Sequence, residues 1–225
     1  MAADLACLDE VAAGAEPRLR LYGWCPPALS LGRFQPDADV DVDACRARGV
    51  EVVRRPTGGR ALLHGADLTY AVALRRPAGA AGHVDALYRT IASGLVAGLG
   101  RLGVEAHVGE DRRAAGPACF AAAQGADLRV GDRKLCGSAQ VQRGSVVLQH
   151  GSILLDRLPF DELDLLAGTA DPVTRSRLRA RSVTLREVGV RTDRAVVAAA
   201  IVAGFESALN VTFESRVRSV DRSGA

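Results

Sequence analysis

Apolar residues recur every three or four positions in several segments of the chain, which is the spacing of an amphipathic helix. The longest stripe passes through Val84, Leu87, Ile91 and Leu95. A further stripe follows the Thr192/Asp193 pair, whose side chains are typical of a helix N-cap. Helices are therefore predicted over residues 2–12, 41–48, 83–102 and 192–209.

Other segments alternate between apolar and polar residues, which predicts β-strands. The clearest alternation places Leu68, Tyr70, Val72 and Leu74 on one face of a half-buried strand. Strands are predicted over residues 18–24, 28–34, 50–55, 67–74, 126–130, 138–142 and 146–155, the last interrupted near His150. Because runs of strands are separated by inserted helices rather than by strict alternation, an α+β fold with a mixed, mostly antiparallel sheet is expected. No linker divides the chain, so residues 1–225 are expected to form one domain.

Composition narrows the class of protein. With 48% hydrophobic and 24% charged residues, the 225-residue chain is typical of a globular domain. Its five cysteines contain no CxxC pair, which argues against disulfides and a zinc site and favours the cytoplasm. Two acidic residues and no basic region at the N-terminus argue against a signal peptide. The absence of long apolar runs argues against a membrane span, and the net charge of +3 without basic-aromatic clusters argues against nucleic-acid binding.

The use of basic residues is strongly uneven, because Lys134 is the only lysine among 29 basic residues. Lysine carries a compact charge and can lose its proton when buried, whereas arginine cannot. Small residues follow it in Gly137, Ser138 and Ala139, which leave room and backbone amides beside the lysine. By itself, a single lysine is equally compatible with chance.

Two further segments combine features suited to ligand binding. RRPTGGRALLH (54–64) follows a predicted strand and places Gly58 and Gly59 at a turn, where the backbone can approach a ligand closely. It contains neither a GxGxxG nor a GK[ST] motif, and by itself it is more typical of a hairpin with two solvated arginines. GPACF (116–120) places Cys119 in a loop of small residues, which suits an accessible thiol, although most free cysteines are simply buried.

In this order, RRPTGGRALLH, GDRKLCGSAQ and LQHGSILLD resemble the motifs of the biotin/lipoate protein ligase and octanoyltransferase superfamily. The N-terminal ACLDEVA, LYGWCPPALSLGRFQ and the late RSVTLREVG also fit, so the resemblance spans nearly the whole chain. It implies a catalytic domain with a central mixed sheet flanked by helices, similar to class II synthetases, and an acyl group bound over the sheet. It also implies that Lys134 contacts the acyl carbonyl and that no cofactor or metal is needed. The implied substrate-binding residues are Arg54, Arg55, Thr57, Gly58, Gly59, His64, Gly137, Ser138, Ala139, His150 and Gly151.

The branches of this superfamily differ in their motifs. The GRGRxG loop of biotin ligases is absent, and GGRALLHG differs from the GGGxVxHD pattern of lipoate ligases at Arg60 and Gly65. The chain also ends soon after the last predicted helix, without room for the accessory domain of many such ligases. One octanoyltransferase branch has its cysteine far downstream of the lysine, whereas the last cysteine here, Cys136, follows Lys134 almost directly. A second branch, with TGGRAVLH, ACF and LQHGSILLD, resembles this chain and implies Cys119 as its nucleophile.

The resemblance therefore implies an octanoyltransferase that works through a Cys119 thioester. Its implied partners are octanoyl-acyl carrier protein and a lipoyl domain or glycine cleavage H protein, with the chain itself a monomer. Lys134 is expected to orient the substrate and to deprotonate the acceptor lysine, and the amides around 137–139 to stabilise the oxyanion. An ATP-dependent lipoate ligase and an amidotransferase between carrier proteins remain alternatives.

Overall fold

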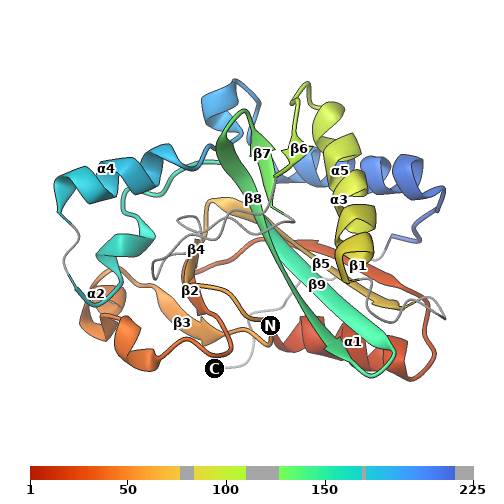
Figure 1. Ribbon diagram of the computed structural model, residues 1–225, viewed down its shortest axis with the longest axis horizontal. Coiled ribbons are helices and arrows are strands. Elements are labelled where there is room, and N and C mark those ends of the chain that lie inside the picture. Colours follow the sequence, from red (N-terminus) through yellow and green to blue (C-terminus); the bar gives the residue numbers. More distant parts are fainter. Residues whose placement is uncertain (77–83, 110–126, 169–170, 216–225) are drawn as a thin grey trace.

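The computed structural model describes residues 1–76, 84–109, 127–168 and 171–215. Within these residues the chain forms two sheets with helices packed against them (Figure 1). The predicted α+β class is confirmed. Among the described strands, the expected parallel pairing occurs in the smaller sheet, between β2 and β3. None of the helices in the described ranges combines the length and apolarity required to cross a bilayer.

The larger sheet has six strands and is antiparallel throughout. In spatial order they are β1 (Arg18–Tyr22), β5 (Asp67–Arg75), β9 (Val146–Leu154), β8 (Arg133–Arg143), β7 (Leu128–Val130) and β6 (His107–Val108). The smaller sheet pairs β2 (Ala28–Leu31) in parallel with β3 (Glu51–Arg54) and antiparallel with β4 (Leu62–His64).

Helices cover both faces of the larger sheet. On one face, α3 (Val84–Gly100) and α5 (Arg194–Leu209) pack over the alternate residues Leu68, Tyr70 and Val72 of β5. On the other face, α1 (Ala2–Ala12) packs over Ala71 and Ala73. Since successive side chains of a strand point to opposite faces, β5 is buried on both sides, and the prediction of a half-buried strand was wrong.

The helical spacing located α1 and the long helices closely, and the cap of α5 is Asp193, as predicted. Two predictions for the strands need correction. β9 runs without interruption through His150, and β8 begins at Arg133, so that Lys134 lies on a strand. Periodicity predicted α2 (Val42–Ala47). It did not predict β4, β6, α4 (Pro172–Ala180) or the separation into two sheets.

Candidate functional site

A cavity lies where the smaller sheet meets β8 and β9 of the larger sheet. β4 supplies Leu62 and His64, β8 supplies Lys134 and its small neighbours, and β9 supplies His150 and Gly151. Segments that are far apart in sequence therefore converge on one space. The full lining consists of Met1, Ser30, Arg55, Gly59, Arg60, Leu62, His64, Thr69, Asp127, Lys134, Gly137, Ser138, Ala139, His150 and Gly151.

The single lysine of the chain is buried in this cavity and forms an ion pair. Lys134 is 3% exposed, and its Nζ lies 2.9 Å from Oδ2 of Asp127, which is 1% exposed. Asp127 also accepts a hydrogen bond from the backbone N–H of Ser138 at 3.4 Å. A buried charge is costly unless a partner of opposite sign compensates it. Asp127 therefore stabilises the charged ammonium of Lys134 beside the small residues that follow it on β8.

His64 takes part in a second buried network in the same cavity. Its Nδ1 lies 2.8 Å from Oδ2 of Asp67, and its Nε2 lies 2.9 Å from Oγ of Ser30. When Nδ1 donates to a carboxylate, Nε2 is left as the acceptor nitrogen of the ring. The ring also stacks on Trp24, with centroids 4.4 Å apart, so both its tautomer and its orientation are fixed. His64 Nε2 is therefore held at a defined position on the cavity wall, in contact with the Ser30 hydroxyl.

The carboxylate of Asp67 has three side-chain neighbours that can donate hydrogen bonds. Besides His64, the hydroxyls of Thr69 and Ser152 donate to its Oδ2 at 2.8 and 2.7 Å. Burial raises the pKa of Asp67, but the neighbouring imidazole, the Gly65 N–H and the Ser152 hydroxyl outweigh burial, and the net pKa is lowered. Asp67 therefore stays ionised and keeps His64 in place.

His150, which also lines the cavity, has its own set of polar partners. Its Nε2 is 2.6 Å from Oγ1 of Thr57, and its Nδ1 is 3.5 Å from Oδ2 of Asp4. Burial lowers the pKa of His150, with Asp4 acting in the opposite direction, so the imidazole is predominantly neutral near pH 7. This residue connects the TGGR loop to β9 and to α1, and its neutral ring contributes no charge to the cavity.

The two arginines at the start of the RRPTGGRALLH segment point in different directions. Arg55 lines the cavity, and its guanidinium donates to backbone oxygens of Ser30, Gly58 and Arg60 at 2.7 to 3.2 Å. Arg54 instead donates to Gly32 O at 2.7 Å and Gln35 O at 2.8 Å, and it also pairs with Asp37. Arg55 thus holds the shape of the loop, whereas Arg54 does not line the cavity in this structure.

Glycines on this wall allow backbones to approach where side chains would collide. A Cβ at Gly151 would lie 2.4 Å from the carbonyl oxygen of Gly137 and 2.5 Å from the ring of Tyr70. A Cβ at Gly32 would lie 2.0 Å from the carbonyl oxygen of Gly59, whose φ of +99° is itself suited to glycine. The TGGR loop can therefore approach the end of β2 closely, whereas the approach to a ligand expected from Gly58 and Gly59 stays a prediction.

Most of the predicted binding residues meet at this cavity, although their roles remain predictions. Those in its lining are Arg55, Gly59, His64, Lys134, Gly137, Ser138, Ala139, His150 and Gly151. Thr57 reaches it only through His150, Gly58 accepts from Arg55, and Arg54 turns away. Cys119 lies outside the described residues. Cys136 is completely buried in the core beneath the α3/α5 face.

Three polar residues that hold the site together were not recognised from the sequence: Asp127 and Ser30 in the cavity lining, and Asp67, which contacts the lining residue His64. Asp67 offered a local signal, since it follows His64 at a spacing of three residues across a Gly-Ala turn. Asp127 and Ser30 offered none, because their partners Lys134 and His64 lie on other strands. Within the described residues, no group of three or more His, Cys, Asp or Glu side chains is arranged to hold a metal ion.

Comparisons with known proteins agree with this geometry. Residues 1–206 match the family model of the lipoyl protein ligase A/B catalytic domain. The chain is 46% identical to octanoyltransferase LipM of Symbiobacterium thermophilum, over 87% of this chain and 76% of that protein. It is 43% identical to octanoyltransferase LipM of Kyrpidia tusciae, over 88% of this chain and 77% of that protein.

Among solved structures, a Thermoplasma acidophilum protein assigned as a lipoate protein ligase, with bound lipoic acid, superposes with a TM-score of 0.76. The identity is 25%, over 96% of this chain and 83% of that chain. A lipoate-protein ligase A bound with ATP gives a TM-score of 0.74 at 25% identity, over 96% of this chain and 82% of that chain. This chain belongs to the lipoyl protein ligase A/B catalytic-domain family.

Proposed function

We propose that this family member is an octanoyltransferase of lipoate biosynthesis, which moves an octanoyl group from acyl carrier protein to a lysine of a lipoyl domain or glycine cleavage H protein. The observation that carries the proposal is the buried Lys134–Asp127 pair facing the small residues of β8. The extensive identity to two curated octanoyltransferases supports the same reaction.

Covalent transfer through Cys119 is the mechanism proposed for this reaction. The Cys119 thiolate attacks the thioester carbonyl of the donor, a new C–S bond forms, and the carrier thiolate leaves and takes up a proton. The amine of the acceptor lysine then attacks the acyl-Cys119 carbonyl, so that an amide forms and the Cys119 thiolate is released. A cysteine with an ordinary pKa near 8.5 is only a few per cent thiolate at neutral pH, so this step needs a nearby positive charge.

Lys134 is the residue proposed to supply this positive charge, and it can also act on the acyl group. Its ammonium, held by Asp127 at 2.9 Å, can donate a hydrogen bond to the acyl carbonyl oxygen as negative charge develops there. The cavity measures about 40 Å³, which accommodates the carbonyl end of an acyl group.

The acceptor amine must lose a proton before or during its attack, and two residues of the cavity can take it. Lys134 was expected to do so, but its pairing with a buried carboxylate stabilises the ammonium form. His64 offers the acceptor nitrogen Nε2, since Asp67 holds Nδ1, and the Ser30 hydroxyl that lies 2.9 Å from Nε2 can relay the proton. We therefore assign charge stabilisation to Lys134 and propose His64 as the general base.

Intact-mass spectrometry tests covalent transfer directly. Incubation with octanoyl-acyl carrier protein in the absence of ATP is expected to add one octanoyl group, which hydroxylamine removes. Cys119→Ala should abolish the adduct, and the control Cys136→Ala should retain it because that thiol is fully buried. An adduct on Cys136, or one that forms only with ATP, would contradict the proposal and favour a different nucleophile or the lipoate ligase reaction.

A second measurement distinguishes transfer from acyl carrier protein from amidotransfer between lipoyl carriers. The acylated enzyme should form when octanoyl-acyl carrier protein is the donor and should pass octanoyl to a lipoyl domain or H protein. If octanoyl-H protein acylates Cys119 and octanoyl-acyl carrier protein does not, the enzyme is an amidotransferase and the proposed donor is wrong.

A further inference from the structure

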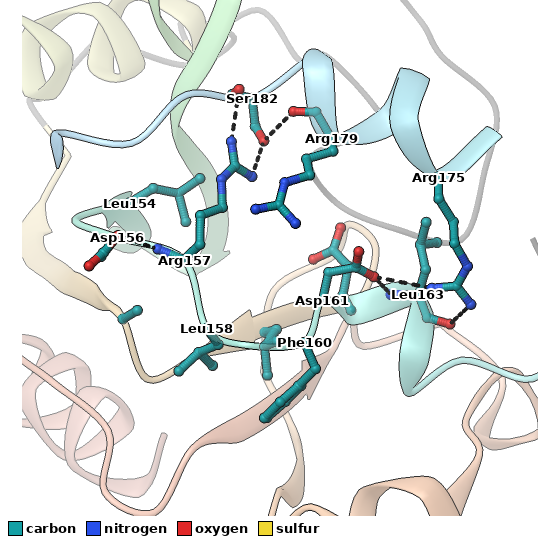
Figure 2. A pocket seen from close by; sticks show the side chains of 13 residues that line it. Leu154, Asp156, Arg157, Leu158, Phe160, Asp161, Leu163, Arg175, Arg179 and Ser182 are labelled. Atoms are coloured by element: carbon teal, nitrogen blue, oxygen red, sulfur yellow. Dashed lines mark hydrogen bonds and ion pairs between the residues drawn. The ribbon is translucent and has the colours of Figure 1, made fainter. Parts of the chain in front are cut away.

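A second and larger cavity lies beside the first, between β4, the end of β9 and α4 (Figure 2). Its volume is about 100 Å³. The apolar part of its wall includes Leu63, Leu154, Leu158 and Phe160. Sequence reasoning assigned no role to these residues, and the mechanism above makes no use of them.

The two cavities share structural walls. Leu63 of the second cavity directly precedes His64 of the first, on the same short strand. Ser182 of the second cavity forms an isolated β-bridge with Lys134, where the Lys134 N–H donates to Arg181 O at 2.8 Å and the Val183 N–H donates to Lys134 O at 2.9 Å. A ligand in the second cavity therefore lies next to the strand that carries the buried lysine.

Three arginines (Arg157, Arg175 and Arg179) and three acidic residues (Asp156, Asp161 and Glu162) line the second cavity. Figure 2 shows the side chain of Arg179 directed from α4 into the space between Arg157 and Asp161. Arg157 is already engaged, since it pairs with Glu187 and donates to Ser182. Asp161 pairs with Arg175 and Asp156 pairs with Arg186. Among the described residues, the exposed guanidinium of Arg179 takes part in no hydrogen bond or ion pair. Arg179 is thus available for an anionic group.

The accessibility of the reacting centre restricts the shape of the donor. Lys134 is only 3% exposed, so the folded body of a donor protein cannot reach it. A donor must instead present its acyl thioester on a long and narrow arm. A cavity with an apolar wall, an arginine at its edge and a position beside Lys134 matches an arm that carries a phosphate at its outer end.

We propose that the second cavity binds the 4′-phosphopantetheine group of the acyl donor, with its phosphate at Arg179 and its chain along the apolar wall. The proposal rests on the octanoyltransferase function proposed above. Acyl carrier protein and coenzyme A both present this group, so the shared chemistry is assigned here and the donor is left to experiment.

The test compares three octanoyl donors by the rate of Cys119 acylation at limiting donor concentration. Octanoyl-acyl carrier protein and octanoyl-coenzyme A carry the phosphate, and octanoyl-N-acetylcysteamine lacks it. In Arg179→Gln, the rate with either phosphate-bearing donor, divided by the rate with octanoyl-N-acetylcysteamine, should fall about tenfold, which corresponds to about 1.4 kcal/mol. Arg177→Gln is the matched control, since Arg177 is exposed on the same helix and does not line the cavity.

Each outcome decides between the alternatives. An unchanged ratio in Arg179→Gln, with adducts still formed from all three donors, overturns the inference and leaves the octanoyltransferase function intact. A fall confined to the carrier-protein donor also overturns it, because Arg179 would then contact the carrier surface rather than the arm. The absence of an adduct from every donor instead contradicts the proposed function itself.

A second variant tests the apolar wall. Leu158→Trp should fill the cavity and raise the KM for octanoyl-coenzyme A about tenfold, with an unchanged melting temperature as the check on folding. Competition provides an independent measurement: 4′-phosphopantetheine should slow acylation by octanoyl-coenzyme A more strongly than pantetheine does. Competition by AMP without competition by 4′-phosphopantetheine would assign the cavity to a nucleotide and overturn the inference.

Discussion

The buried Lys134–Asp127 pair gives the sharpest test of how the cavity is held together. Replacing Asp127 with Asn leaves the ammonium of Lys134 inside the protein without its carboxylate partner. Both side chains are at most 3% exposed, so solvent does little to compensate the charge. Removing one partner of a buried ion pair costs about 3–5 kcal/mol. A domain is typically stable by about 5–15 kcal/mol, so the loss is a large fraction of the total.

Urea denaturation measures this loss. With an m-value of about 3 kcal/mol/M, a loss of about 4 kcal/mol lowers the unfolding midpoint of Asp127→Asn by about 1.3 M. Lys134→Met should destabilise the protein similarly, because it leaves Asp127 without the ammonium. The double variant removes both charges and should recover most of the lost stability. Its transfer activity should nevertheless stay absent, since no ammonium faces the carbonyl.

This comparison separates the structural role of the pair from its chemical role. A midpoint shift below about 0.3 M for Asp127→Asn would show that the two charges are solvated or compensated elsewhere. Additive losses in the double variant would show that the two side chains do not depend on each other. Recovery of octanoyl transfer in the double variant would refute the assignment of charge stabilisation to Lys134.

Two other predictions follow from packing and from titration. Gly204→Ala should destabilise the fold by about 1–3 kcal/mol in urea denaturation, because its Cβ would lie 2.1 Å from the Gly98 nitrogen, where α5 meets α3. Gly100→Ala, on α3 with open space around it, is the control, and equal losses in the two variants would contradict the close-packing explanation. For His150, burial lowers the folded-state pKa below the value of about 6.5 expected when unfolded, so the unfolded chain binds the proton first as pH falls. Stability should therefore drop below about pH 6.5 by up to about 1.4 kcal/mol per pH unit, and denaturation at pH 7.5, 6.5 and 5.5 should show a shallower drop in His150→Gln. The same slope in both proteins would mean that other groups titrate.

The sequence by itself determined the local elements and the identity of the central residues. The helical spacing of Leu5, Leu8 and Val11 located α1 at the bounds that the structure has, because that periodicity depends only on neighbouring residues. The single lysine and the TGGR segment indicated where chemistry is concentrated, and both lie at one cavity. The continuous β9 was misjudged because His150 interrupts the apolar pattern without interrupting the backbone ladder.

Only the tertiary structure decided which polar groups compensate one another. Asp4 meets His150 across 146 residues, and Arg54 and Arg55, adjacent in sequence, point to different parts of the molecule because successive strand residues alternate. Asp127 gave no pattern of its own, yet it determines the charge that surrounds Lys134. Spacing along a chain reports which face a residue occupies, whereas the partner of a buried charge is fixed by how distant strands pack together.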